Sequence, residues 1–157
     1  MNRSVRLVLA VAGIGLLQVA CASDDALCAP LVAFVSAVPP KQSREFAFHT
    51  IWGGAFKDDP SPQAMYQARC IHHGFEPGKA VCDYLLKNGH VEFPGIDARR
   101  ALECLSPTTH LDGRVRVDRG DFSLTFGTDE RGSLVKVLFD ADPEVGGMVL
   151  RITAEGY

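Results

Sequence analysis

Histidines are the first candidates for chemistry in this sequence, which holds five of them. His49 stands among aromatic residues in an alternating stretch, where it could act as a general base. No nucleophile motif lies near it, and neither G-x-S-x-G nor H-E-x-x-H occurs in the chain. His72 and His73 are adjacent, so on a helix their side chains diverge by about 100° and do not hold one metal ion together. The histidines therefore favour neither a catalytic site nor a metal site.

A group of acids near the C-terminus comes closest to a cation site. Asp140, Asp142 and Glu144 precede Gly146-Gly147, a spacing similar to that of a calcium-binding loop. The glycine comes one place late, and Arg151 stands where such a loop needs a bidentate glutamate. We therefore expect an acidic hairpin loop here, and we expect neither a metal nor a cofactor in the protein.

The N-terminal residues resemble a secretory signal peptide. Arg3 and Arg6 are positive, and the apolar run over 7–17 is too short to span a bilayer comfortably. The small residues of Ala20-Cys21-Ala22 suit a signal peptidase, so we expect residues 1–22 to be removed. The alternative is a lipoprotein signal over 1–20 that leaves Cys21 lipidated. That signal needs an aliphatic residue where Gln18 stands, so cleavage after Ala22 is favoured.

The remaining cysteines are Cys28, Cys70, Cys82 and Cys104. An even number of cysteines in an exported chain predicts two disulfides, and four cysteines allow three pairings, among which the sequence does not choose. The last three cysteines are separated by 11 and 21 residues, with no C-x-x-C pair, which disfavours zinc. Oxidised cysteines would also exclude a catalytic Cys–His pair.

The net charge of the chain is −3, and it becomes −5 once residues 1–22 are removed, with 14 Lys+Arg left against 19 Asp+Glu. Nucleic acid is therefore excluded as the expected partner, because affinity for it comes from clustered Lys and Arg. Residues 23–157 have the length of a single domain that can bury a core.

The first part of this domain, about 24–106, has mainly helical patterns. Predicted helices cover 27–38, 61–73, 76–88 and 97–105. The third and fourth begin near Glu76-Pro77 and Asp97, and the second begins at Ser61-Pro62 as cap and first helical residue. Between the first two helices, residues 44–52 alternate between apolar and polar side chains and predict a strand.

The second part, about 111–157, predicts a four-stranded antiparallel β-meander. Its predicted strands cover 114–118, 121–127, 133–140 and 148–154, separated by turns rich in Gly and Asp. One apolar face would carry Val115, Val117, Phe122, Leu124 and Phe126. We expect an α+β fold in which short, disulfide-linked helices pack on this meander, with strand 44–52 added at an edge.

Candidate binding residues follow strand 44–52. Trp52 and Phe56 flank a pair of glycines, and aromatic side chains beside flexible backbone are suited to contact a partner. Asp58 and Asp59 follow in a polar loop and could steer a basic partner towards them. The alternative is that Trp52 closes the end of the core.

These features predict an exported bacterial protein of the periplasm that binds another protein and is not an enzyme. We expect an inhibitor or immunity-type protein, whose partner is a basic enzyme that targets the cell envelope, or a toxin. One alternative is an envelope lipoprotein with a structural role, which touches the membrane only through lipidated Cys21. Another is a small periplasmic hydrolase in which His49 meets Asp58, Asp59 or another carboxylate.

Overall fold

The structure is a computed structural model, and it describes residues 25–59 and 65–157. The expected signal peptide, Cys21 and the expected helix start at Ser61-Pro62 lie outside the described residues.

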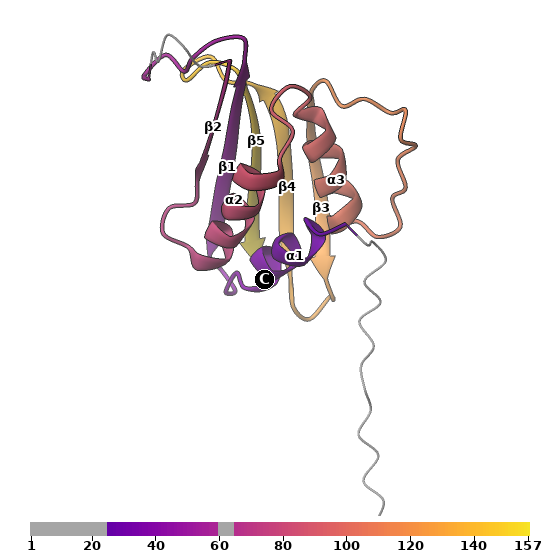
Figure 1. Cartoon of the computed structure of the whole chain (residues 1–157). Helices are drawn as coiled ribbons and strands as arrows, with labels where there is room; N and C mark the ends of the chain where they lie inside the picture. The colour runs from indigo at the N-terminus through magenta and orange to yellow at the C-terminus, as the bar shows by residue number, and fades with distance from the viewer. Residues whose placement is uncertain (1–24, 60–64) are drawn as a thin grey trace, which may run out of the picture.

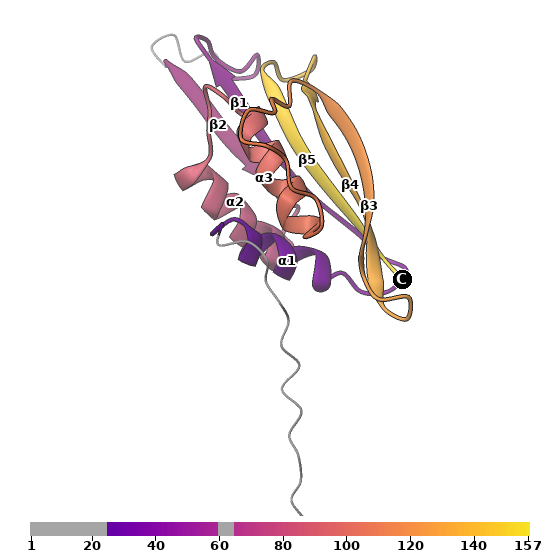
Figure 2. The ribbon, with the colours of Figure 1, turned by 90° about the vertical axis from the view of Figure 1, so that its right-hand side faces the viewer.

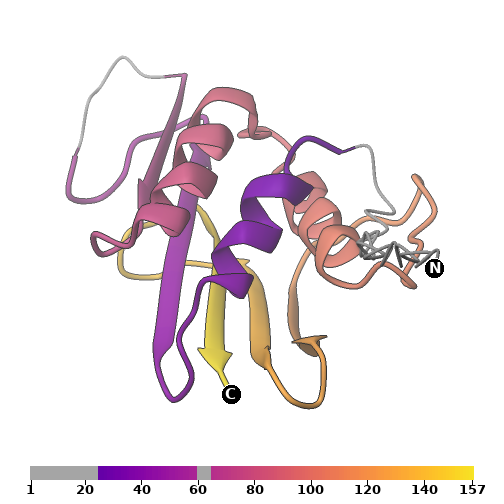
Figure 3. The same cartoon turned by 90° about the horizontal axis from the view of Figure 1, so that it is seen from below.

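Five antiparallel strands form one sheet in the order β2-β1-β5-β4-β3. The strands are β1 (Ser43–Trp52), β2 (Tyr66–Ile71), β3 (Gly120–Gly127), β4 (Gly132–Ala141) and β5 (Met148–Gly156). The helices are α1 (Cys28–Ser36), α2 (Glu76–Asn88) and α3 (Gly95–Leu105). All three helices lie on the same face of the sheet (Figures 1 to 3). The expected α+β fold with disulfide-linked helices is therefore confirmed.

The main core lies between the helices and this face of the sheet. In β1 the alternation of side chains sends Phe46 and Phe48 towards the helices, where both are fully buried. Phe34 of α1 packs edge-on against Phe46, with ring centroids 5.2 Å apart. The apolar periodicity of the sequence identified these positions correctly, because each helix and strand must bury one face.

Most helix ends lie where the sequence predicts them. Asp25 accepts a hydrogen bond from the backbone N–H of Leu27 (2.8 Å), and Pro30 lies in the first turn of α1, where a proline is tolerated. Glu76-Pro77 opens α2, and Gly89 follows its end.

Two disulfides join the helices to the rest of the domain. Cys28–Cys104 links α1 to α3, and Cys70–Cys82 links β2 to α2. The prediction of two intramolecular bridges is confirmed, and one of the three possible pairings is selected. Each helix is therefore covalently tied to another element.

A buried polar network holds the N-terminal end against the helices. The Arg100 guanidinium on α3 donates to Asp25, to Tyr84 of α2 and to Asp97, at distances of 2.6 to 2.9 Å. The Asp97 side chain is fully buried and also accepts from the backbone N–H of His90 (2.6 Å). The hydrogen bonds from Arg100 lower the pKa of Asp25, although burial acts in the opposite direction.

The predicted helix 61–73 is wrong over its second half, because residues 66–71 form β2. Tyr66 pairs with Trp52, and the ladder continues to the pair of Ile71 with Ala47. Pairing with β1 and the disulfide at Cys70 outweigh the local helical pattern, since propensity is a weak term beside tertiary contacts. Strand β1 is consequently not at the edge of the sheet, because β2 lies outside it.

The predicted strand 114–118 is also absent, so the C-terminal meander consists of three strands, β3 to β5. The backbone N–H of Val115 instead closes a turn on the Asp112 carbonyl (2.7 Å). Farther along, the Val117 carbonyl lies against Gly95 at the start of α3, so close that a Cβ on Gly95 would be 2.0 Å from the Val117 oxygen. These contacts hold the segment towards α3 and away from β3.

Candidate functional site

The four binding residues predicted from sequence all lie on or next to the connection between β1 and β2. This connection leaves one end of the sheet at the upper left of Figure 1. Trp52 is the last residue of β1, and Phe56, Asp58 and Asp59 belong to the loop that follows. The structure therefore brings them into one corner of the domain, but it gives them different environments.

Trp52 is on the surface, where it stacks on Tyr66, the first residue of β2. The two rings are nearly parallel, with centroids 6.1 Å apart and an interplanar angle of 10°. Their exposed fractions are 48% and 57%, and the adjacent Met65 is 73% exposed. We call Trp52, Met65 and Tyr66 the aromatic corner. This arrangement contradicts the alternative in which Trp52 closes the end of the core.

Phe56 is buried, with an exposed fraction of 3%. The Arg69 guanidinium lies over its ring, 4.6 Å from the centroid, and its backbone N–H donates to Gln67 Oε1 (2.6 Å). Phe56, Ala47 and Val149 are the buried apolar residues that do not belong to the main core. The loop therefore folds back over the sheet face opposite the helices, and Phe56 anchors the loop there instead of facing a partner.

The two loop aspartates differ in their pairing. Asp58 Oδ2 accepts a hydrogen bond from Arg69 Nη1 at 2.7 Å, and this bond lowers the pKa of Asp58. Asp59 is exposed, and its backbone N–H donates to the Phe56 carbonyl in a turn. Asp59 therefore keeps its charge available at the surface, whereas Arg69 neutralises much of the field of Asp58.

The loop that connects β4 and β5 pins the β1–β2 loop in place. The backbone N–H of Lys57 donates to the Val145 carbonyl (2.9 Å), and Lys57 Nζ donates to the Pro143 carbonyl (2.5 Å). Gly147 has φ +75°, and a Cβ there would lie 2.1 Å from the Thr50 carbonyl oxygen, so only glycine allows this close approach. The aromatic corner therefore rests on two loops that fix each other.

His49 lies beneath these loops and is 2% exposed. Its Nδ1 is 3.4 Å from Asp142 Oδ2, without hydrogen-bond geometry. Burial lowers the pKa of His49, the Asp142 charge acts in the opposite direction, and the charges of Arg69 and Arg151 add to the lowering. A His–carboxylate pair thus exists, but it involves Asp142 and neither Asp58 nor Asp59. His49 lines none of the three cavities found among the described residues, so no substrate reaches it in this conformation.

The acidic loop that contains Asp142 is organised by backbone hydrogen bonds. Asp142 Oδ1 accepts from the backbone N–H groups of Glu144 (2.9 Å) and Val145 (3.0 Å). Burial opposes its ionisation, but these two bonds and nearby charges keep the pKa of Asp142 below its usual value. Asp140 pairs with Arg119 at 3.0 Å. The expected hairpin loop is therefore present, and within residues 25–59 and 65–157 no three His, Cys, Asp or Glu side chains gather as a metal site.

His72 and His73 lie in the turn after β2, where His73 has φ +48°. Both line a polar groove of about 270 Å³. Its other lining residues are Ser43, Arg44, Glu45 and Thr153. The turn places the two histidines by backbone geometry that the predicted helix did not foresee.

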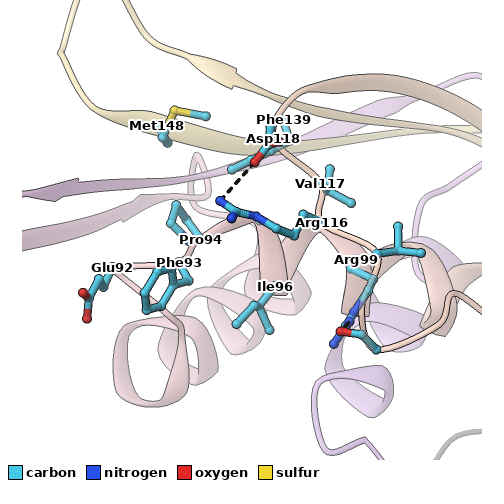
Figure 4. A pocket seen from close by; sticks show the side chains of 13 residues that line it. Glu92, Phe93, Pro94, Ile96, Arg99, Arg116, Val117, Asp118, Phe139 and Met148 are labelled. Atoms are coloured by element: carbon cyan, nitrogen blue, oxygen red, sulfur yellow. Dashed lines mark hydrogen bonds and ion pairs between the residues drawn. The ribbon is translucent and has the colours of Figure 1, made fainter.

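Two apolar grooves beside the segment 113–118 were not anticipated from the sequence. The first has a volume of about 480 Å³ and lies between the start of α3 and this segment, with the Arg116–Asp118 ion pair (3.6 Å) beside it (Figure 4). Its apolar lining includes Phe93, Met148 and Phe139. The second, of about 400 Å³, lies between the same segment and β3. The strand predicted for 114–118 would have filled this second space.

No helix in the described part of the chain is long and apolar enough to cross a bilayer. No protein-family model matches the chain, and neither does any of the curated proteins or solved structures with which it was compared.

Proposed function

We propose that this protein is an exported bacterial protein of the periplasm that acts by binding another protein, as an inhibitor or immunity-type protein, and that it has no catalytic role. The aromatic corner is the observation that carries this proposal. Large aromatic side chains that remain exposed on a fixed backbone are typical of the anchor residues at protein interfaces.

The rigidity of the corner supports this reading. Trp52 and Tyr66 are paired in the β1–β2 ladder, and β2 is tied to α2 by the Cys70–Cys82 disulfide. A surface that is already ordered loses little conformational entropy on binding, so more of the contact energy appears as affinity. Disulfides also agree with an oxidising compartment.

The charge of the protein supports a basic partner. The chain has a net charge of −3, and Asp59 lies exposed near the corner. An acidic surface accelerates the association of a basic protein and has a smaller effect on the dissociation rate. We expect salt to slow association for this reason.

The test is capture from an envelope extract of the host by the oxidised, mature protein. We expect one basic protein to be retained, and we expect Trp52→Ala and Tyr66→Ala each to weaken its binding by about 2 kcal/mol or more, the range of interface anchors. Leu86→Ala is the matched control, because Leu86 on α2 is 49% exposed, close to the 48% of Trp52.

Equal binding by Trp52→Ala, Tyr66→Ala and Leu86→Ala would contradict this surface as the interface. Turnover of a substrate by the purified protein, lost in His49→Ala, would replace the binding role with a hydrolase. Retention in the membrane fraction through acylated Cys21, without any captured protein, would instead favour a structural lipoprotein.

A further inference from the structure

Strand β3 is an edge of the sheet, and half of its backbone groups point away from β4. The backbone N–H of Thr128 donates to the Arg131 carbonyl (2.9 Å), which fixes which pairs in the antiparallel register exchange hydrogen bonds. By this alternation Phe122, Leu124 and Phe126 bond to β4. The backbone N–H and C=O groups of Asp121, Ser123 and Thr125 point outward.

The second apolar groove lies directly beside this edge. It has a volume of about 400 Å³ and is bounded by β3, the end of α3 and the segment 113–118. Its apolar lining residues are Leu102, Leu111, Val115, Val117, Phe122 and Leu124. The groove therefore combines a free hydrogen-bonding edge with an apolar floor, which are the two features that an added strand uses.

The opposite edge of the sheet lacks this combination. The outward backbone groups of β2 belong to Tyr66, Ala68 and Cys70, because the backbone N–H of Gly53 bonds the Met65 carbonyl. None of the three cavities found among the described residues is lined by a residue of β2. Only the β3 edge thus has an apolar space beside it.

The charge of the groove defines its occupant. Arg116 and Arg119 are its charged lining residues, and no carboxylate lines it. Both arginines are largely exposed and pair with Asp118 (3.6 Å) and Asp140 (3.0 Å). Exposed pairs of this kind contribute little and exchange readily. The groove is therefore a locally cationic site in a chain whose net charge is −3.

We propose that this groove binds an extended segment of a partner protein in which acidic and apolar residues alternate, and that the segment adds to β3 as a sixth strand. Its apolar side chains enter the groove, its acidic side chains meet Arg116 and Arg119, and its backbone bonds Asp121, Ser123 and Thr125. The proposal uses the opposite edge of the sheet from the aromatic corner, so it stands or fails independently of that surface.

The competing occupant is the chain's own segment 114–118, whose sequence favours a strand. In the structure the backbone N–H groups of Arg116, Val117 and Asp118 make no backbone hydrogen bond within the described residues, and Val117 is held at Gly95. Hydrogen exchange of the free protein separates the two cases. We expect the amides of Ser123 and of 116–118 to exchange rapidly, and protection of both in the free protein would overturn the proposal.

The binding test uses a synthetic, end-capped heptapeptide of alternating Val and Glu, titrated into the isotope-labelled, oxidised protein and followed by NMR. We expect chemical-shift changes at Asp121, Ser123 and Thr125, together with slower amide exchange there. A peptide of the same composition with its Glu residues in one block should bind at least about tenfold more weakly, and so should the alternating Val/Lys peptide.

Variants locate the site. Ser123→Pro removes an N–H that β4 does not use, so the sheet tolerates it on an edge while the peptide loses a hydrogen bond and affinity falls about tenfold. Ser123→Ala keeps the N–H and should bind normally. Arg116→Gln with Arg119→Gln should weaken binding about three- to tenfold, whereas Arg114→Gln, whose side chain is 91% exposed and outside the groove, should leave binding unchanged.

Three results would overturn the proposal. They are the absence of binding at millimolar peptide, shift changes that map to β2 or to the aromatic corner, and unchanged affinity for a peptide N-methylated at alternate residues. The last measurement leaves the protein intact, so it applies even if Ser123→Pro does not fold.

Discussion

Replacing Arg100 by glutamine should destabilise the domain by about 2–4 kcal/mol, because the change leaves a buried carboxylate short of its charged partner. The Arg100 side chain is 14% exposed and bonds Asp97, whose side chain is fully buried, and Asp25, whose side chain is 26% exposed. Asp97 keeps the hydrogen bond from the backbone N–H of His90, so the loss stays below that of an isolated buried charge. Asp25 can turn towards water and contributes the smaller part.

The assay is equilibrium unfolding of the oxidised protein in urea at neutral pH, with the free energy compared between Arg100→Gln and the parent. Arg114→Gln is the control, because Arg114 makes a similar bond to Asp112 (2.9 Å) but is 91% exposed, and its loss should cost less than 1 kcal/mol. A double-mutant cycle with Asp97→Asn should show coupling of about 1 kcal/mol or more. Equal effects of Arg100→Gln and Arg114→Gln would refute the argument that burial gives this network its weight.

Three further outcomes follow from the structure. The folded-state pKa of His49 lies below its unfolded value of 6.5, so between the two values the unfolded chain binds a proton that the folded chain does not. Stability should therefore fall as pH decreases from 7.5 to 5, and His49→Gln should show a weaker fall in urea unfolding at the two pH values; parallel curves would contradict this. Replacing Cys70 and Cys82 by serine should cost about 3 kcal/mol, and replacing Cys28 and Cys104 about 4.5 kcal/mol, because the loops close 12 and 76 residues. Thermal unfolding measures both, and the reverse order would count against the entropic account. Intact mass of the protein from its host should correspond to a chain that begins at Ser23, and acyl chains on Cys21 would reverse that expectation.

The sequence predicted those elements whose apolar periodicity agrees with their final packing. Helices α1, α2 and α3, and strands β1, β3, β4 and β5, each bury the face that their pattern marks. Residues 66–71 were misread, because pairing with β1 and a disulfide to α2 are long-range contacts without a local signal. Residues 114–118 have a strand pattern, but a turn at Asp112 and the close contact of Val117 with Gly95 hold them elsewhere.

The candidate site was predictable only in part. Composition indicated that Trp52 contacts a partner, and its exposure is consistent with that role. Its stacking partner, Tyr66, could not be identified while that residue was assigned to a helix. The burial of Phe56 and the contact of His49 with Asp142 both depend on how two loops fold over the sheet. Residue types alone do not specify such an arrangement.

The place of β5 has a consequence for how the protein is made. This strand is the last element of the chain, yet it lies between β1 and β4 in the middle of the sheet. Until Met148–Gly156 has been synthesised, the sheet consists of two separate ribbons, β1–β2 and β3–β4, and the core between them is open. Folding must therefore wait for the final residues, as is typical of topologies dominated by long-range contacts. Under the proposed export, this delay keeps the nascent chain unfolded, and hence fit for threading through a translocation channel, until its C-terminus has left the ribosome.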